Sequence, residues 1–174
     1  MTDKKAAIPE GKPVAASTSV LATLAEPADA NPMGNVHGGH IMKLVDQAAA
    51  AAAIRHAGRL CVTASIDRLD FLHPVRIGDM IELKSAVNYT HNTSMEVGVH
   101  IETENLASGV RNHVASAYLI FVALDERGRP VSVPPVIPES NSEKLRYQQA
   151  ELRYRQRKDT REQERALDTA SRDR

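Results

Sequence analysis

Asp46 is the one acidic residue in a helix-like run of apolar and small residues that follows a Gly-rich turn, His37-Gly38-Gly39-His40. The first residues of a helix carry backbone N–H groups without helical partners, and these groups stabilise negative charge. A carboxylate among apolar neighbours is costly unless it has a role. Amide donors and an acid are the groups needed to polarise and attack an acyl carbonyl, so this segment is the first candidate for catalysis.

Both features also have a purely structural interpretation. Asp46 either has a structural role, pointing to solvent or pairing with Lys43, or it acts as a general base or nucleophile. The glycines either give the backbone freedom for a tight helix entry, or they allow the Gly39 and His40 amides to act as oxyanion donors. Spacing alone leaves both interpretations open.

The distance between the donors and the acid implies a second subunit. Gly39 and Asp46 are seven residues apart, which on a helix is about 10 Å along the axis. One small reacting group cannot contact both. Two copies of the helix lying antiparallel across a two-fold axis would bring the donor of one level with the acid of the other. We therefore expect at least a dimer and an inactive monomer.

Further polar residues near the expected core elements are weaker candidates. The turn that contains Thr93 and Ser94 offers hydroxyls and backbone amides, and several basic residues on or near strands offer charge, so these groups are candidates for holding phosphates. His37 and His40 are too few for a metal site, which needs at least three protein ligands, and we expect no metal. The remaining candidates are Asn31, Thr63, Ser65, Arg76, Lys84 and Arg111.

The elements that must position these residues follow from hydrophobic periodicity. Apolar residues recur at helical spacing from Gly39 to His56, where a stretch of alanines would let a curved sheet approach the helix closely. One expected strand precedes the helix and four follow it, joined by short turns that favour antiparallel neighbours in a meander. The pattern predicts an α+β fold with a helix on one face of an antiparallel sheet. The expected strands are Ser17–Leu24, Cys61–Leu72, Met80–His91, Met95–Glu104 and Arg111–Leu124.

The sequence predicts three segments. Residues 1–16 mix charged, Pro and Gly residues without an apolar period and are expected to form a flexible arm. Residues 17–135 form the folded domain. A Pro-rich bridge from Val133 to Pro138 leads into the third segment, residues 136–174, a charged helical tail with a thin apolar stripe. We expect this stripe to dock on the domain or a neighbour and the tail to lose order after Tyr154.

Composition excludes several classes of protein. The 174 residues include 22 Lys plus Arg and 22 Asp plus Glu, so no net charge favours nucleic acid or an anionic membrane as a partner. No apolar segment approaches the roughly 20 residues of a membrane-spanning helix, and no signal peptide is evident. The single Cys61 fits a reducing compartment. We expect a cytoplasmic protein.

Several of these motifs together resemble the hotdog-fold acyl-CoA thioesterases of the cytosolic acyl-CoA hydrolase type. The resemblance spans Thr18 to Pro135. One departure from the family is His40, where relatives often carry a bulky aromatic residue. The motifs are Asn31-x-x-Gly34, His37-Gly38-Gly39-x-Ile41-Met42-x-x-x-Asp46, Val62-Thr63, Asp70-Phe71-x-x-Pro74-Val75-x-x-Gly78-Asp79, Thr93-Ser94-Met95 and Phe121-Val122-Ala123-Leu124-Asp125.

The resemblance implies a long helix wrapped by a five-stranded antiparallel sheet, a dimer with a continuous sheet, and usually a trimer of dimers. It also implies hydrolysis of acyl-CoA to free carboxylic acid and CoA without a further cofactor. Asp46 would activate water or attack the carbonyl, and Gly39 would be the oxyanion donor. Asn31 and Thr63 would position water and thioester. His37, Gly38, His40, Ser65, Arg76, Thr93 and Ser94 would contact the substrate.

Two other functions remain open at this stage. A hotdog enoyl-CoA hydratase or dehydratase would use a His and an acid to move protons beside the thioester carbonyl, and His37 and His40 keep that alternative open. A non-catalytic acyl-CoA binding module would bind without turnover. The preferred acyl length, the role of Asp46 as base or nucleophile, and nucleotide regulation are not determined by the sequence.

Overall fold

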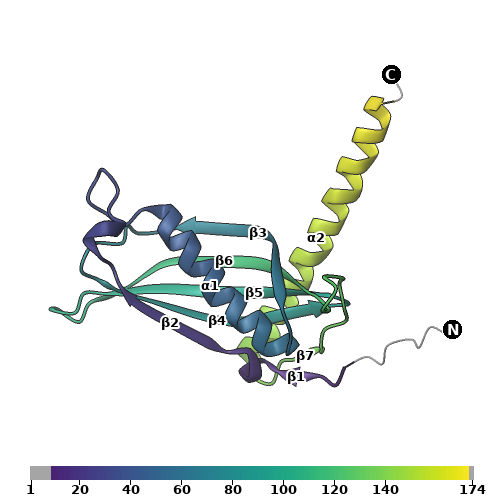
Figure 1. Ribbon diagram of the computed structural model, residues 1–174, viewed down its shortest axis with the longest axis horizontal. Helices are drawn as coiled ribbons and strands as arrows, with labels where there is room; N and C mark the ends of the chain where they lie inside the picture. Colours follow the sequence, from purple (N-terminus) through teal and green to yellow (C-terminus); the bar gives the residue numbers. More distant parts are fainter. Residues whose placement is uncertain (1–8, 173–174) are drawn as a thin grey trace. The chain divides into compact units, whose positions relative to one another are not determined.

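The computed structural model describes residues 9–172 and has an antiparallel sheet of five strands with a long helix across one face (Figure 1). The sheet order is β2-β4-β5-β6-β3, and each neighbouring pair is antiparallel. The predicted α+β hotdog class is confirmed. The strands are β2 (Ser19–Leu24), β3 (Cys61–Phe71), β4 (Met80–His91), β5 (Ser94–Glu104) and β6 (Arg111–Ala123).

The central helix α1 (Gly38–Ala57) packs closely on the sheet because its buried face is made of alanines. Ala48 and Ala52 are buried, and Ser85 of β4 donates a hydrogen bond from Oγ to the Ala48 carbonyl at 2.7 Å. Larger side chains would hold the two backbones apart, so this contact requires the small residues. Gly58 ends the helix with a φ of 68°, a left-handed conformation that favours glycine.

The position of β3 differs from the expected meander of four consecutive strands. Strands β4, β5 and β6 do follow one another in the sheet, but β3 pairs with β6 at one edge, and β2 lies beside β4. The segment 72–79 between β3 and β4 is long enough to cross the sheet, whereas the two-residue joint 92–93 links direct neighbours. As an edge strand, β3 has one unpaired side, and none of its 11 residues is buried.

The N-terminal segment is more structured than expected. Residues 1–8 of the predicted arm lie outside the described residues, but β1 (Lys12–Pro13) pairs in parallel with β7 (Val136–Ile137), and a 3-10 helix, η1, covers Val14–Ser17. Val14 is buried, and Ser17 Oγ accepts a hydrogen bond from the Val87 amide at 2.9 Å. Residues 12–16 thus have regular structure where the sequence suggested a flexible arm, because the β1–β7 pairing and the burial of Val14 hold them.

The chain divides into two compact units, with the boundary between Ile137 and Pro138. The second unit contains α2 (Asn141–Arg172), so the predicted helical tail is confirmed. The helix continues past Tyr154, where we expected order to fade. Ion pairs one turn apart, such as Arg155 with Glu151 at 2.9 Å, stabilise a helix that lacks an apolar core of its own. Within residues 9–172, no helix combines the length and apolarity needed to cross a bilayer.

Candidate active site

Asp46 lies in the middle of α1 and is half-buried beside the open edge of the sheet. The Thr63 hydroxyl of β3 donates a hydrogen bond to Asp46 Oδ1 at 2.6 Å. Thr63 pairs in register with Phe121, whose side chain is buried under the helix, so Thr63 also faces α1. The Asp46–Thr63 pair thus brings together two of the four predicted catalytic residues.

The first turn of α1 is capped by the side chain of His37. His37 is the N-cap residue, and its Nδ1 accepts a hydrogen bond from the Gly39 amide at 3.1 Å. The His40 amide donates to the His37 carbonyl at 2.8 Å. Both amides predicted as oxyanion donors therefore have partners within this chain, and a substrate oxygen at Gly39 must replace the His37 ring.

His40 and Gly38 take part in local contacts around the same turn. The His40 ring lies 3.0 Å from an Asp29 carboxylate oxygen, measured from Nδ1. A Cβ added at Gly38 would lie 3.8 Å from the Phe71 ring, which is ordinary van der Waals contact. A larger residue would therefore fit at position 38, so lack of space does not explain the glycine. Its neighbour Phe71 is an apolar side chain that was not among the predicted site residues.

The helix geometry keeps Gly39 away from Asp46. The 20 residues of α1 form one uninterrupted helix, so the seven-residue separation corresponds to about 10 Å along the axis. The side-chain oxygen of Asn31 already has partners in the loop before α1: its Oδ1 accepts hydrogen bonds from the Met33 and Asn35 amides at 2.9 and 3.2 Å. One chain does not bring the predicted oxyanion donor and the acid to the same reacting carbon.

Ser65 and Thr63 lie on opposite faces of the sheet. A β-bulge between them inserts Ala64, so that Ser65 pairs with Ile120, the residue next to the partner of Thr63. The Ser65 hydroxyl is buried and has no hydrogen-bond partner within the described part of the chain. A ligand held at Thr63 would not contact Ser65 of the same chain.

Arg76 and the Thr93–Ser94 turn lie at opposite ends of β4. The 12 residues of this strand correspond to roughly 40 Å. Arg76 lines an open cavity of about 490 Å³ near the start of α1, with His73, Asp79 and Asn112 among its other walls. At the other end, the Ser94 hydroxyl donates to the His91 carbonyl at 3.1 Å. These phosphate candidates cannot serve one ligand within one chain.

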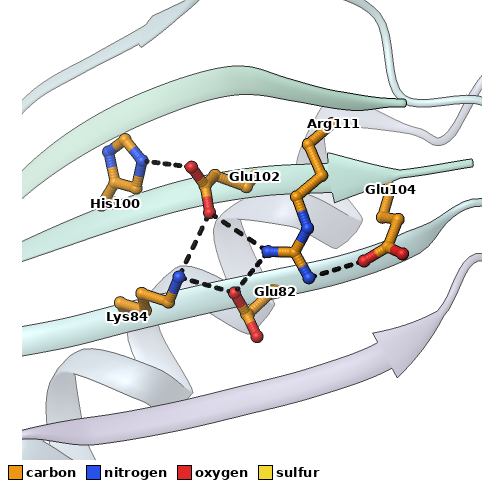
Figure 2. Close-up of polar contacts among 6 residues, drawn as sticks. All are labelled: Glu82, Lys84, His100, Glu102, Glu104 and Arg111. Carbon is orange, nitrogen blue, oxygen red and sulfur yellow. Dashed lines mark hydrogen bonds and ion pairs between the residues drawn. The ribbon is translucent and has the colours of Figure 1, made fainter. Parts of the chain in front are cut away.

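Lys84 and Arg111 are already neutralised by carboxylates (Figure 2). Lys84 Nζ lies 2.8 Å from Glu82 and 3.2 Å from Glu102. Arg111 lies 2.6 Å from Glu104 and 3.4 Å from Glu82. The hydrogen bond from Lys84 and the adjacent Arg111 lower the pKa of Glu82. This network on strands β4 to β6 surrounds the two cations with three carboxylates, so neither cation is a strong phosphate candidate.

A second open cavity, of about 650 Å³, was not identified from the sequence. It lies where the end of α1 meets the turn after β6. Arg127 and Arg129 flank Gly128 in this turn, and neither was among the candidate residues predicted from the sequence. Its lining residues are Gly58, Arg59, Leu60, Leu124, Asp125, Glu126, Arg127 and Arg129. Among the described residues, no three His, Cys, Asp or Glu side chains gather as a metal site would need.

Comparison with known proteins identifies the family. Residues 33–109 match the Thioesterase superfamily. The uncharacterized acyl-CoA thioester hydrolase YkhA of Bacillus subtilis is 40% identical over 144 residues, which are 83% of this chain and 84% of that protein. The chain belongs to the thioesterase superfamily. This thioesterase-family chain is also 38% identical over 152 residues to the cytosolic acyl coenzyme A thioester hydrolase of Rattus norvegicus, of which it spans only 40%.

Solved structures of thioesterases share most of this fold. An apo-hexameric acyl-CoA thioesterase has a TM-score of 0.85 and 38% identity, covering 87% of this chain and 97% of that one. The acyl-CoA hydrolase of Staphylococcus aureus, in complex with butyryl coenzyme A, coenzyme A and coenzyme A disulfide, has a TM-score of 0.83 and 36% identity, covering 92% and 98%. Three further structures of the Staphylococcus aureus enzyme carry alanine in place of an aspartate, an asparagine and a threonine, respectively.

Proposed function

We propose that this thioesterase-family chain hydrolyses acyl-CoA thioesters to free carboxylic acid and CoA at an active site shared by two subunits. The observation that carries the proposal is the Asp46–Thr63 hydrogen bond, which holds a carboxylate on an otherwise apolar helix beside an open sheet edge. The names of the relatives support acyl-CoA as the substrate class. Asp, Asn and Thr are also the residue types replaced in the Staphylococcus aureus variants and the types of Asp46, Asn31 and Thr63.

The proposed mechanism follows from the carboxylate and the helix start. Thr63 fixes Oδ1 of Asp46, and Oδ2 removes a proton from water as the hydroxide attacks the thioester carbonyl. The Gly39 amide of the partner subunit receives the oxyanion in place of the His37 ring. Collapse of the tetrahedral intermediate breaks the carbon–sulfur bond, and the CoA thiolate leaves and takes up the proton held by Asp46, which restores the carboxylate. Direct attack by Asp46 through an anhydride is the alternative within the same arrangement.

The free edge of β3 supports the proposed dimer. An unpaired edge strand is a template for pairing with another chain, and two such edges would form one continuous sheet. Apolar side chains stay exposed beside this edge: Val62 is 46% exposed, Ile66 42% and Met42 of α1 41%. The hexameric assembly of similar thioesterases supports a trimer of dimers. We further propose a cytoplasmic location, with no cofactor beyond the CoA of the substrate and no nucleic acid or membrane partner.

The test is release of free thiol from a panel of acyl-CoA substrates by the parent and by Asp46→Asn, which keeps the shape and removes the base. Loss of a general base costs roughly 10²-fold or more in turnover. Asp159→Asn removes an exposed carboxylate from α2 and is the matched control, expected to be neutral. Turnover of Asp46→Asn within about tenfold of the parent would reject the proposed role.

Two assays distinguish hydrolysis from the alternative functions. Within one chain the His37 ring caps α1 and the His40 ring pairs with Asp29, so both rings already have partners other than Asp46. Incubation with an enoyl-CoA separates hydration, which adds water and releases no thiol, from hydrolysis. Tight acyl-CoA binding without any turnover would instead indicate a binding module.

A further inference from the structure

Helix α2 carries a stripe of uncharged residues along one side. Nine basic and six acidic residues make almost half of its 32 positions charged, yet three leucines on this side are 55%, 57% and 71% exposed. The steps from one member of the stripe to the next are three or four residues, so all members lie on one side of the helix. The uncharged stripe consists of Leu145, Gln149, Leu152, Gln156, Thr160, Gln163 and Leu167, all of them exposed.

The spacing of the uncharged stripe is the same from either end. Leu145 and Leu167 each lie 11 residues from Gln156, and the steps are symmetric about that residue. An 11-residue repeat is close to the helical period, so the stripe runs nearly straight along α2. Two antiparallel copies that cross at Gln156 would therefore bring stripe residues opposite each other over its whole length. The facing pairs would be Leu145–Leu167, Gln149–Gln163, Leu152–Thr160 and Gln156 with its own copy.

The facing residues also match in chemistry. The pair of Leu145 and Leu167 is apolar, and facing glutamines can exchange hydrogen bonds between their amide groups. Thr160 donates its hydroxyl to the Gln156 carbonyl of its own helix at 3.0 Å, so its methyl group is left to contact Leu152. The uncharged stripe is therefore complementary to a second helix of the same sequence.

Charged residues beside the stripe favour the antiparallel orientation. With the copies crossing at Gln156, Arg146 would lie near Glu164 of the second copy, and Arg155 near Asp159. The two-fold axis makes each of these contacts occur twice. Charges that flank a helix pair fix its orientation more than its strength.

A parallel pair would instead bring like charges together. Asp159 would lie near Glu164 of the second copy, and Arg155 near Arg157. The antiparallel pair has one contact between like charges on its flanks, Arg153 with Arg157, against the two favourable contacts above. Charge complementarity therefore selects the antiparallel pair.

We propose that α2 binds α2 of a second copy of this chain as an antiparallel pair centred on Gln156. Three leucines per helix bury too little surface to hold two monomers together. The pair therefore forms between subunits of a larger assembly, where several weak contacts act together. It uses neither the β3 edge nor Asp46, so it does not depend on the proposed function.

Disulfide crosslinking of single-cysteine variants tests the pair and its orientation. Cys61→Ser removes the one native cysteine, and Gln156→Cys then places a thiol at the centre of the pair. Oxidation of the assembled protein should give a crosslinked dimer, because the facing Cβ atoms are within disulfide reach. Gln149→Cys alone should give none, since its two copies lie about 21 Å apart along the helix axes. Co-expression of Gln149→Cys with Gln163→Cys should restore the crosslink.

The control is Arg161→Cys, an exposed position about 140° around the helix from Gln156. It should not crosslink, and a yield equal to that of Gln156→Cys would reveal random collision and overturn the proposal. Efficient crosslinking of Gln149→Cys alone would indicate a parallel pair and would also overturn it. The same holds if the folded Gln156→Cys protein gives no crosslinked dimer, because the stripe would then not face a second copy.

Charge reversal gives a second measurement in the Gln156→Cys protein. Glu164→Arg would place like charges opposite Arg146 at two contacts and should slow crosslinking about fivefold. The double change Arg146→Glu/Glu164→Arg exchanges the charges and should restore the parental rate. A double variant that crosslinks as slowly as Glu164→Arg would contradict the proposed register. None of these measurements uses hydrolysis, so they test the pair even if the proposed function fails.

Discussion

At the scale of single residues, Thr63 has the clearest assignment. Its hydroxyl donates a 2.6 Å hydrogen bond to Asp46 and so fixes the direction of the second carboxylate oxygen. Thr63 does not need to contact the substrate for this effect. We therefore treat it as a positioning residue that acts through Asp46.

Replacement of Thr63 by valine should lower kcat by about tenfold or more, because a hydrogen bond to a charged group contributes about 1.5–3 kcal/mol. Valine preserves the shape and the strand propensity, so the melting temperature should change little. Thr63→Ser restores the hydroxyl and should recover most of the activity. Equal kcat values for the valine and serine variants would rule out a role for the hydroxyl.

His37 should prove to be a helix cap rather than a catalytic residue. Its ring accepts a hydrogen bond from the Gly39 amide, and loss of such a cap costs about 0.5–2 kcal/mol of stability. We expect His37→Ala to melt at a lower temperature and to keep turnover within about threefold of the parent. His37→Asn, with an oxygen that can replace Nδ1, should recover the stability. A normal melt combined with a hundredfold loss of turnover would show instead that the ring moves protons.

At the scale of elements, His56 ties the end of α1 to the segments that flank the fold. Its Nε2 donates to the Pro134 carbonyl at 2.8 Å, and Lys12 Nζ donates to the His56 carbonyl at 2.8 Å. The residue is fully buried, and burial is the main reason that its pKa is lowered from 6.5, with a smaller contribution from the charge of Lys12. The imidazole is therefore neutral in the folded protein at neutral pH.

This burial predicts sensitivity to acid. Below about pH 6.5 His56 binds a proton in the unfolded chain but stays neutral in the folded chain. The free energy of unfolding therefore falls as the pH drops through the folded pKa. His56→Gln keeps a donor for Pro134 and cannot titrate. When the pH is lowered from about 7.5 to 5.5, the melting temperatures of both proteins should fall, and that of His56→Gln should fall by a few degrees less. The same fall in both proteins would assign the acid sensitivity to the other six histidines.

The element boundaries follow from local patterns, whereas the strand order does not. The helix expected from Gly39 to His56 extends by one residue at each end, and β4 has the expected bounds. The pairing of β3 with β6 joins Cys61 to Ala123, which are far apart in the chain. No local pattern distinguishes this arrangement from a simple meander, because both bury the same alternating residues.

The candidate site, like the strand order, could be predicted only in part from the sequence. Asp46 was recognisable as an acid in an apolar helix, and the family resemblance pointed to Thr63. The bulge at Ala64 turns Ser65 to the other face, and the His37 ring takes the Gly39 amide. The orientation of Ser65 and the hydrogen bond to His37 both depend on backbone geometry, which cannot be deduced from the residue types. The arginines of the second cavity were readable as basic residues, but only the fold brings Arg59 beside Arg127.

At the scale of the whole molecule, the separation of donor and acid makes assembly a requirement of the proposed chemistry. About 10 Å of helix separates Gly39 from Asp46 in one chain, and the edge of β3 is unpaired on the side where a second copy would bind. Ile66 pairs with the buried Leu119 and therefore faces the helix side, yet it is 42% exposed. In the proposed dimer a second subunit would cover it.

Replacement of Ile66 by lysine should prevent assembly and abolish activity together. A charge buried at the proposed β3 interface without a partner costs several kcal/mol, so native mass spectrometry should show monomers where the parent shows a dimer or larger assembly. Because a monomer would have the acid without an oxyanion donor in reach, thiol release should fall by roughly 10²-fold or more. Val20→Lys, at a 57% exposed residue on the opposite edge strand, is the matched control. A monomeric Ile66→Lys protein with parental turnover would show that one chain contains the complete site, and the shared-site mechanism would have to be abandoned.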